Sequence, residues 1–366
     1  MNSNVTRRDF LKTAGVAAAV AGALPSAWAQ ADKKITLALV GGAHIHTPGF
    51  IDLLKTRNDT RVKYVWDHDA ARAEKRAKDL NATVVKDLGQ IWSDSEIPAV
   101  VIYSETNRHH DLVLAAAKAG KHMFVEKPLG ITARESLAMA EAIEKANLLF
   151  TTGYFMRTDP KHLFLKDEIA KGHFGKITRA RGSNCHSGAL EGWFDTEWRW
   201  MADPKIAGIG GFGDLGTHKL DILMWMLGDI DAVTADVRTV TGRYPGCDEC
   251  GEGLIQFKDG VIGTLAAGWV DVEDPVRFLI SGTEGHAVVV DNHLYYKSKH
   301  IPGSDSKDPF TKLPAAARPP MHQFLDAVAG SKDQPLVKPS EAAARVVAME
   351  ALYKGAREKK WVSVKS

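Results

Sequence analysis

The chain has 366 residues, of which 45% are hydrophobic and 25% are charged. A chain of this length and composition can bury a large core, and we expect two domains. Its 47 Lys and Arg residues nearly balance 45 Asp and Glu residues. This balance argues against nucleic acid or an anionic membrane as partner and favours small polar molecules. Three cysteines are too few for a scaffold built on disulfides.

The first 29 residues follow the pattern of a targeting segment. Arg7-Arg8 precedes an apolar stretch from Ala14 to Leu24, and Ala27-Trp28-Ala29 is a small-x-small cleavage site. The apolar stretch is shorter than the roughly 20 residues that span a bilayer. The twin arginines followed by Phe-Leu-Lys resemble the twin-arginine signal, which exports folded proteins. We expect cleavage after Ala29, no membrane anchor afterwards and a periplasmic protein; the alternative is a cytoplasmic protein with a chance Arg-Arg pair.

From Lys33 onward, short apolar runs alternate with helical periodicity, which is typical of βαβ units around a parallel sheet. Ile35 to Val40 predicts the first strand, and residues 41–48 form the turn that follows it. In that turn we expect Thr47 to be the N-cap of a helix over 49–55, with Pro48 at its first position. Val62 to Trp66 predicts the second strand.

Further apolar runs continue the alternation. Strands are expected at 99–103 and 122–125, with a helix over 111–119 between them. This is the order of a doubly wound, Rossmann-type fold. We therefore predict an α/β protein whose residues 33–150 form a dinucleotide-binding domain around a parallel sheet.

The glycine turn after the first strand is the expected phosphate site. In the usual G-x-G-x-x-G pattern, the second glycine lets the backbone approach the pyrophosphate and the third lets helix and strand pack closely. Ala43 and His46 replace those two glycines, so the turn is reshaped or the pyrophosphate binds differently. Asp67, directly after the second strand, is expected to bind the ribose 2′-hydroxyl, which favours NAD over NADP. The cofactor contacts expected in the turn are Gly41, Gly42, Ala43, His44 and His46.

His44 and His46 also allow a different interpretation, because an H-x-H pair after a strand can be half of a metal site. A metal-dependent hydrolase needs further His and carboxylate ligands from later strands and an open position for water. We find no such series in the sequence. We therefore expect no metal site, and we assign both histidines to hydrogen bonds in the phosphate turn.

A set of motifs follows in fixed order over nearly the whole chain after residue 33. The most specific are Glu126-Lys127-Pro128 and, much further on, the pair Asp214 and His218. The other elements are Ala99-Val100-Val101-Ile102, Arg108-His109, Ala116, Ala119-Gly120-Lys121-His122, Gly153-Tyr154, Arg157-x-x-Pro160, Gly172 to Gly175, Gly208-x-Gly210 and Asp221. This set resembles the Gfo/Idh/MocA oxidoreductases, the family of glucose-fructose oxidoreductase and inositol dehydrogenase. The chain departs from the family pattern at the first turn and at Glu105, where the family often has proline.

The resemblance implies an NAD(P)-dependent enzyme that oxidises CH–OH groups. Such chemistry needs a base for the hydroxyl proton and a cation or donor for the developing alkoxide. By resemblance, Lys127 holds the reacting hydroxyl and the cofactor, His218 accepts the proton, and Asp214 orients the substrate or the imidazole. Asp214 and His218 are four residues apart, so a helix would place both on one face. The alternative is that Asp214 is a helix N-cap and His218 a buried histidine.

Residues near the later strands complete the expected cofactor site. These residues are Ser104, Asn107, His109, Glu126 and Lys127. We also expect the Lys127-Pro128 peptide bond to be cis, since Xaa-Pro bonds tolerate that form.

Residues 151–366 are expected to form a substrate-binding and oligomerisation domain of α+β type. Strand-like runs at 176–181, 232–240, 261–270 and 276–280, with few helices, predict an open, mostly antiparallel sheet. The sheet face without helices would need a cover, so we expect a homodimer or homotetramer.

The substrate is expected to be a carbohydrate or polyol. Aromatic and polar residues gather between Asn184 and Trp200, and aromatic faces beside hydrogen-bond donors suit a sugar ring. The expected substrate contacts are Arg157, His186, Trp193, Arg199, Trp200 and Asp214. Cys247 and Cys250 form a C-x-x-C pattern without the second pair that a zinc site needs, so we interpret it as a turn.

Export of the folded protein restricts the mechanism. Outside the cytoplasm no pool of dinucleotide exists for exchange, so the cofactor should stay tightly bound and be recycled within each turnover. We therefore expect a periplasmic NAD(P)-dependent oxidoreductase of sugars or polyols. An NAD-dependent glycoside hydrolase that acts by oxidation, elimination, hydration and reduction is the main alternative. A metal-dependent hydrolase and a non-catalytic sugar-binding protein are the others.

Overall fold

The computed structural model describes residues 34–365, so the expected signal segment and its cleavage site after Ala29 lie outside the described residues. The chain forms two compact units. The first comprises the described chain up to Gly153 together with Arg318–Ala343, and the second comprises Tyr154–Ala317 and the chain from Ala344. The sequence predicted a single boundary near residue 150. The structure has a boundary after Gly153, and a later segment, Arg318–Ala343, also belongs to the first unit.

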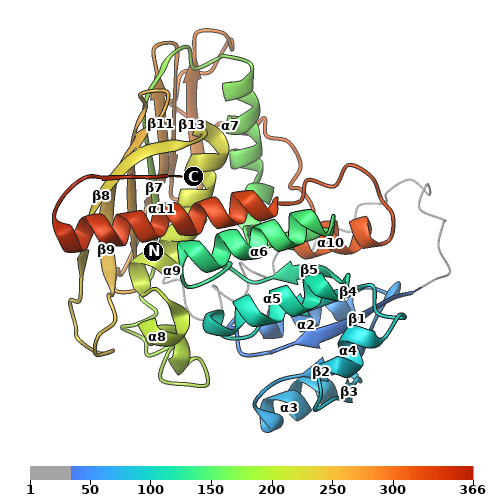
Figure 1. Ribbon diagram of the computed structural model, residues 1–366. Helices are drawn as coiled ribbons and strands as arrows, with labels where there is room; N and C mark the ends of the chain where they lie inside the picture. The colour runs from blue at the N-terminus through green and yellow to red at the C-terminus, as the bar shows by residue number, and fades with distance from the viewer. Residues whose placement is uncertain (1–33, 366) are drawn as a thin grey trace. The chain divides into compact units, whose positions relative to one another are not determined.

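The first unit is built on a six-stranded sheet in the order β3-β2-β1-β4-β5-β6, in which every pair of neighbours is parallel (Figure 1). The strands are β1 (Ile35–Val40), β2 (Thr60–Trp66), β3 (Thr83–Val84), β4 (Ala99–Ile102), β5 (His122–Val125) and β6 (Phe150–Thr152). The helices are α2 (Thr47–Lys55), α3 (Ala70–Leu80), α4 (Gly89–Ser93), α5 (His109–Lys118), α6 (Ala133–Lys145) and α10 (Pro320–Val328), and η2 (Thr106–Arg108) is a 3-10 turn. This order confirms the predicted Rossmann-type fold.

The core of the first unit explains why a late segment of the chain belongs to it. All six residues of β1 are buried, as expected for a parallel strand covered on both faces. Met321, Phe324 and Leu325 of α10 belong to the same apolar cluster as Leu37 and Leu39 of β1. The segment therefore contributes to burying the parallel sheet, and the apolar pattern of one short helix was too weak a signal to assign it from sequence.

The second unit is built on an eight-stranded sheet in the order β13-β12-β11-β7-β10-β9-β8-β14. Its strands are β7 (Ile177–Cys185), β8 (Ile230–Arg238), β9 (Cys250–Phe257), β10 (Ile262–Gly268), β11 (Val276–Gly282), β12 (Gly285–Val290), β13 (His293–Ser298) and β14 (Val362–Ser363). Neighbours are antiparallel except for the parallel pair of β7 and β10. This confirms the predicted open, mostly antiparallel sheet.

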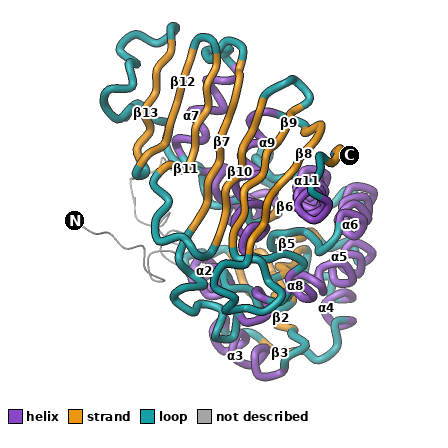
Figure 2. The backbone as a smooth tube through the Cα atoms, turned by 90° about the vertical axis from the view of Figure 1, so that its left-hand side faces the viewer, coloured by secondary structure: helices purple, strands orange, loops and turns teal. Residues whose placement is uncertain are grey.

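Helices cover one face of this sheet. They are α7 (Pro160–Ala170), α9 (Gly211–Leu227) and the later part of α11 (Pro339–Glu358). The unit also contains the short helix α8 (Pro204–Ala207) and the 3-10 turns η3 (Phe155–Thr158) and η4 (Arg199–Ala202). The helix α9 packs against β7 and β10. Figure 2 shows the opposite face of the sheet toward the viewer, with α7 and α9 behind the strands.

The start of α9 is held by a carboxylate from the Cys247–Cys250 segment. The Asp248 side chain accepts the Phe212 amide at 2.9 Å and the Tyr353 hydroxyl at 3.0 Å, which satisfies amides that a helix N-terminus leaves without partners. A Cβ at Gly211 would lie 2.4 Å from the backbone oxygen of Glu249. Asp248 is therefore structural, as is Glu249, whose side chain accepts the Val240 and Thr241 amides. All three cysteines are free thiols.

A buried ion cluster stabilises the second unit. Asp221, with no exposed surface, accepts Arg157 Nε at 2.8 Å, Arg157 Nη2 at 2.6 Å and Arg345 Nε at 2.9 Å. Replacing a buried ion partner leaves the opposite charges without compensation, which is more costly than the pair itself is stabilising.

We therefore predict that Asp221→Asn lowers the free energy of unfolding by roughly 3–5 kcal/mol, measured by urea denaturation. Asp229→Asn is the matched control, because Asp229 is 70% exposed beside Lys258 and its change should cost about 0.5 kcal/mol or less. Equal midpoints for the two variants would contradict the role of the cluster.

Candidate active site

The expected cofactor residues gather at the carboxyl edge of the parallel sheet in the first unit. The strands β1, β4 and β5 are neighbours, and each is followed by residues that the sequence singled out. These are the glycine turn after β1, Ser104 after β4, and Glu126-Lys127 after β5. Ligands of open α/β sheets bind at this edge.

Gly41 is the glycine that the turn cannot replace. Its φ is +79°, a left-handed conformation that side chains other than glycine rarely adopt. A Cβ there would lie 2.6 Å from Ser104 Cβ, so the turn after β1 can approach the end of β4 only with glycine at this position. The structure thus gives Ser104, which is buried, a packing role under the turn.

The turn leaves one backbone amide for an anion. The amides of residues 41, 42, 44, 46 and 47 all donate to acceptors within the protein. In the described part of the chain, the amide of Ile45 makes no hydrogen bond. An unpaired amide just before a helix is suited to a phosphate oxygen. The turn therefore fits a dinucleotide. The helix α2 begins one residue earlier than its predicted cap implied, because its N-cap is His46 and not Thr47.

Asp67 has the expected position after β2, but its carboxylate is already engaged. It accepts the Gly42 amide at 2.8 Å, the Asp69 amide at 2.9 Å, and Arg72 Nε and Nη2 at 2.6 and 2.7 Å. Arg72 also donates to Glu105 at 2.8 Å. A ribose hydroxyl can reach Asp67 only if Arg72 releases a bond. The sequence did not predict this bridge, for which Glu105, in place of the family's proline, supplies the second carboxylate.

Glu126 is the central buried charge of the edge. Its Oε1 is 3.0 Å from His46 Nδ1, and its Oε2 accepts the Lys127 amide at 2.8 Å and is 4.0 Å from His44 Nε2. A Cβ at Gly153 would lie 2.9 Å from Oε2, so glycine lets the backbone pass close behind the carboxylate. Glu126, His44 and Lys127 are each 2% exposed.

The surroundings of Glu126 keep it ionised. Burial alone raises its pKa, but the charges of His44 and His46, the hydrogen bond from His46 and the charge of Lys127 together hold the pKa of Glu126 well below its usual range. Burial, the charge of Glu126 and a hydrogen bond to that carboxylate raise the pKa of Tyr103 well above its ordinary value. The site therefore contains a fixed negative charge directly beside the expected catalytic lysine.

His44, His46 and Glu126 also form a candidate metal-binding group. One ligand atom from each lies within 4.8 Å of the others. Glu126, the third candidate ligand, was not recognised from the sequence, because it was assigned to the family motif and its proximity to the H-x-H pair depends on the order of strands in the sheet. Two imidazoles and a carboxylate are a donor set that zinc accepts.

Two other expected cofactor residues have different surroundings. His109 is fully buried, with Nδ1 3.1 Å from the carbonyl oxygens of Pro128 and Leu129 and Nε2 3.3 Å from that of Ser104. It therefore holds the loop after Lys127, whose bond to Pro128 is cis as expected, and burial lowers its pKa. Asn107 is exposed in η2.

In the second unit, Asp214 and His218 both lie on α9, which confirms that a helix carries them. Gly210 is the N-cap, so the alternative in which Asp214 caps the helix is wrong. Asp214 accepts the indole N–H of Trp269 at 3.1 Å. His218 is 3% exposed, and its ring centroid is 4.9 Å from that of Phe155 and 6.2 Å from that of Tyr154.

The expected substrate residues divide into buried and accessible ones. The expected substrate contact of Arg157 is corrected, because its guanidinium makes a bidentate ion pair with Asp221 and so stabilises the fold. Trp193 is also buried, packs on His186 at 4.7 Å between ring centroids and donates to Glu191. Arg199 is exposed, with its guanidinium 4.7 Å from the Tyr244 ring centroid, and Trp200 is half-buried.

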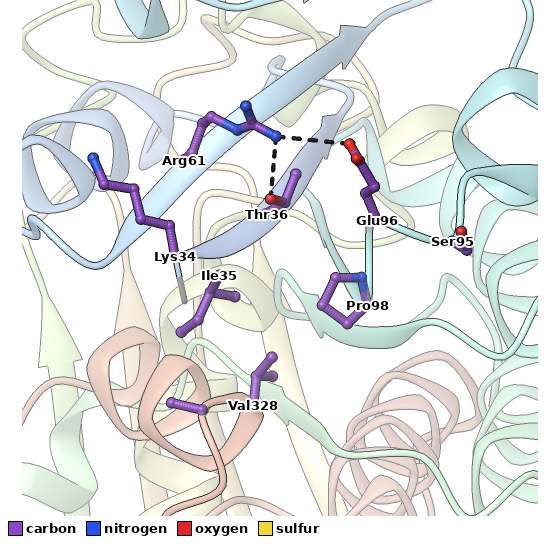
Figure 3. Close-up of a pocket in the computed structure, with 9 residues that line it drawn as sticks. Lys34, Ile35, Thr36, Arg61, Ser95, Glu96, Pro98 and Val328 are labelled. Atoms are coloured by element: carbon purple, nitrogen blue, oxygen red, sulfur yellow. Dashed lines mark hydrogen bonds and ion pairs between the residues drawn. The ribbon is translucent and has the colours of Figure 1, made fainter. Parts of the chain in front are cut away.

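A cavity of about 760 Å³ lies at the opposite end of the parallel sheet (Figure 3). It is lined at the amino ends of β1 and β2 by Thr36 and Arg61, and Arg61 lies 3.8 Å from Glu96 and 3.4 Å from the Thr36 hydroxyl. None of the expected site residues lines this cavity. Its position separates it from the glycine turn and from Glu126.

The low pKa of Glu126 makes a testable contribution to stability. A carboxyl whose pKa is depressed by folding stabilises the protein above its unfolded value of 4.5, and the contribution is lost as the pH falls through the lower folded value. Glu126→Gln should have a free energy of unfolding at least about 2 kcal/mol lower than that of the wild type at pH 7. Below pH 4.5 its stability should fall less steeply than that of the wild type, measured by thermal unfolding at a series of pH values. Glu141→Gln, at an exposed position of α6, is the control; a wild-type pH profile in Glu126→Gln would contradict the prediction.

Family models match most of the chain. Residues 35–154 match the model described as "Oxidoreductase family, NAD-binding Rossmann fold", and residues 162–288 match the "GFO/IDH/MocA C-terminal domain". Residues 4–23 match the "TAT (twin-arginine translocation) pathway signal sequence". Within residues 34–365, no helix combines the length and the apolar character that crossing a membrane requires.

Two curated relatives of this chain are named as dehydrogenases, one of levoglucosan and one of scyllo-inositol. Levoglucosan dehydrogenase of Pseudarthrobacter phenanthrenivorans is 30% identical over 243 residues, which are 60% of this chain and 61% of that protein. The scyllo-inositol 2-dehydrogenase (NAD(+)) of Bacillus subtilis is 30% identical over 229 residues, which are 60% of this chain and 64% of that protein. The chain thus spans less than two thirds of the length of these relatives.

Solved structures share the fold over nearly the whole described chain. Levoglucosan dehydrogenase in complex with NADH and levoglucosan has a TM-score of 0.75 and 23% identity, covering 91% of this chain and 100% of that chain. An NAD binding oxidoreductase from Klebsiella pneumoniae has a TM-score of 0.74 and 23% identity over the same shares. With both domain models matched in order and the architecture shared, the chain belongs to the Gfo/Idh/MocA oxidoreductase family, and its first unit is an NAD-binding Rossmann domain.

Proposed function

We propose that this protein is a periplasmic oxidoreductase of a sugar or polyol that retains its NAD and uses it again in each turnover. One observation carries the proposal: Lys127 directly follows Glu126, which lies against the glycine turn at the ligand-binding edge of the sheet. The family and the names of the relatives support the reaction class.

The residues would divide the chemistry as follows. NAD held at the glycine turn would supply the hydride acceptor and donor for this chemistry. Lys127 holds the reacting hydroxyl and stabilises the developing alkoxide with its positive charge. His218 takes the hydroxyl proton and gives it back, for which an imidazole is suited because its ordinary pKa is near neutrality. Asp214, held by the Trp269 indole, orients the substrate.

The Ile45 amide and the Asp67 carboxylate would hold the cofactor. The Ile45 amide is suited to the pyrophosphate, and Asp67 to the adenosine ribose once Arg72 gives up one of its bonds. A carboxylate at this place repels a 2′-phosphate, which favours NAD over NADP.

The proposed substrate class rests on accessible aromatic and polar residues of the second unit. Trp200, Arg199 and His186 are the proposed contacts, since Arg157 is engaged with Asp221 and Trp193 is buried. The relatives act, by their names, on levoglucosan and scyllo-inositol. No observation favours the glycoside hydrolase over net oxidation and reduction.

We also propose that two copies pair through the uncovered face of the eight-stranded sheet. On that face the neighbouring strands β9 and β10 expose Leu254 by 37% and Ile262 by 55%. Apolar side chains on an open sheet favour such association.

The twin-arginine signal makes cofactor retention the critical test. We predict that mature protein purified from the periplasm, after cleavage at Ala29, releases close to one equivalent of NAD or NADH on denaturation, measured by an enzymatic cycling assay. Protein exported through the unfolded-chain route, by exchange of the signal, should contain none. Loss of all dinucleotide during gentle purification of the folded protein would contradict internal recycling.

The second prediction concerns Lys127. Lys127→Ala should lower the rate of hydride transfer by at least about 10³-fold, because it removes the charge that stabilises the alkoxide. The melting temperature should also fall, because Glu126 loses one of its compensating charges, so the rates are compared at a temperature at which both proteins are folded. The rate is measured as NADH absorbance in a single turnover with a panel of levoglucosan and inositols. Lys121→Ala, at a lysine that donates to the carbonyl oxygens of Asp94 and Ile97, is the control, and an active Lys127→Ala enzyme would remove the lysine from the mechanism.

A further inference from the structure

The glycine turn carries His44 and, in place of its third glycine, His46, and both side chains face the Glu126 carboxylate beside Lys127. We infer that His44 and His46 are positioning residues of the site, which fix the Glu126 carboxylate and through it the backbone of Lys127. The inference rests on the proposed function only for its catalytic consequence. The contacts that carry it lie within the first unit.

The backbone determines the tautomer of His44. The His46 amide donates to His44 Nδ1 at 3.2 Å, so Nδ1 carries a lone pair. In the neutral ring the proton is then on Nε2, which faces Glu126 Oε2 at 4.0 Å. His44 therefore presents an N–H to the carboxylate.

The carboxylate determines the tautomer of His46. An ionised carboxylate only accepts hydrogen bonds, and Glu126 is surrounded by the Lys127 amide, His46 Nδ1 and His44 Nε2. His46 Nδ1, 3.0 Å from Oε1, must therefore carry the proton. Both imidazoles thus point protons at Glu126, which is the reverse of a metal site, where ligand nitrogens must present lone pairs.

These donors leave Glu126 little freedom to turn. Oε1 is held by His46, and Oε2 is held by the Lys127 amide at 2.8 Å. The backbone at Gly153 closes the side behind the carboxylate. A shift of the Lys127 backbone would break its hydrogen bond to a buried charge. The orientation of the Glu126 carboxylate therefore determines the position of the Lys127 backbone from which the side chain extends.

The replacement at position 46 allows a decisive comparison. The usual dinucleotide-binding turn has glycine where this chain has His46, so His46→Gly restores the usual turn but removes a donor from Glu126. If the histidine is merely tolerated, His46→Gly should protect the Lys127 amide from exchange, and turn over substrate, at least as well as the wild type. If His46 positions Glu126, both the protection of that amide and kcat should fall in His46→Gly. His46→Gln, which keeps an N–H donor, should then recover part of the loss.

The primary experiment needs no substrate. Hydrogen exchange of the Lys127 amide is followed by NMR in the wild type, His46→Gly, His46→Gln and the control His110→Gln, whose side chain is 32% exposed beside Asp111. We expect exchange to be at least about tenfold faster in His46→Gly, with smaller change in His46→Gln and none in the control. Imidazole ¹⁵N shifts should show a proton on His44 Nε2 and on His46 Nδ1.

The catalytic arm separates positioning from folding. With levoglucosan or an inositol as substrate, His46→Gly should lower kcat about tenfold or more with little change in KM, and His46→Gln should restore part of it. Unchanged Lys127 exchange in His46→Gly, or binding of one equivalent of added Zn²⁺ by the wild type but not by Glu126→Gln, would overturn the inference. Absence of turnover in the wild type would contradict the proposed function while the exchange result still decides the role of the histidines.

Discussion

The first unit depends on keeping one carboxylate ionised inside a parallel sheet. Removing a carboxylate from water costs several kcal/mol unless donors surround it, and Glu126 receives its donors from three places in the sequence. His46 comes from the turn after β1, the Tyr103 hydroxyl from the end of β4 and the Lys127 amide from the end of β5. The three strand ends are thereby tied to one another by a single charge, at the edge where the cofactor is expected.

This arrangement explains how the fold keeps its phosphate turn without two of its three glycines. Gly41 remains because the end of β4 lies too close for any side chain. The bulk of His46 is accommodated because its ring has a specific partner in Glu126. The turn satisfies most of its own amides and leaves Ile45 for an anion.

Periodicity and short motifs were sufficient for much of the fold. The bounds of β1 and β5 agree with the prediction, because buried parallel strands are short, continuous apolar runs. The strands β9, β12 and β13 were missed, since glycines occupy inward positions of β9 and β12 and only Leu294 and Tyr296 mark the inward face of β13 with apolar side chains. The meeting of His44, His46 and Glu126 required the order of strands in the sheet, which no local pattern contains. Arg157 was assigned to substrate because its partner Asp221 is 64 residues away.

The return of Arg318–Ala343 to the first unit has a consequence for biosynthesis. The apolar core around β1 cannot be completed while the ribosome is still making the second unit, because Met321, Phe324 and Leu325 are not yet available. Folding of the dinucleotide domain therefore cannot be completed until almost the entire polypeptide has emerged from the ribosome, although its signal is synthesised first. A translocation route that accepts its cargo only after folding suits a chain whose earliest domain is finished so late.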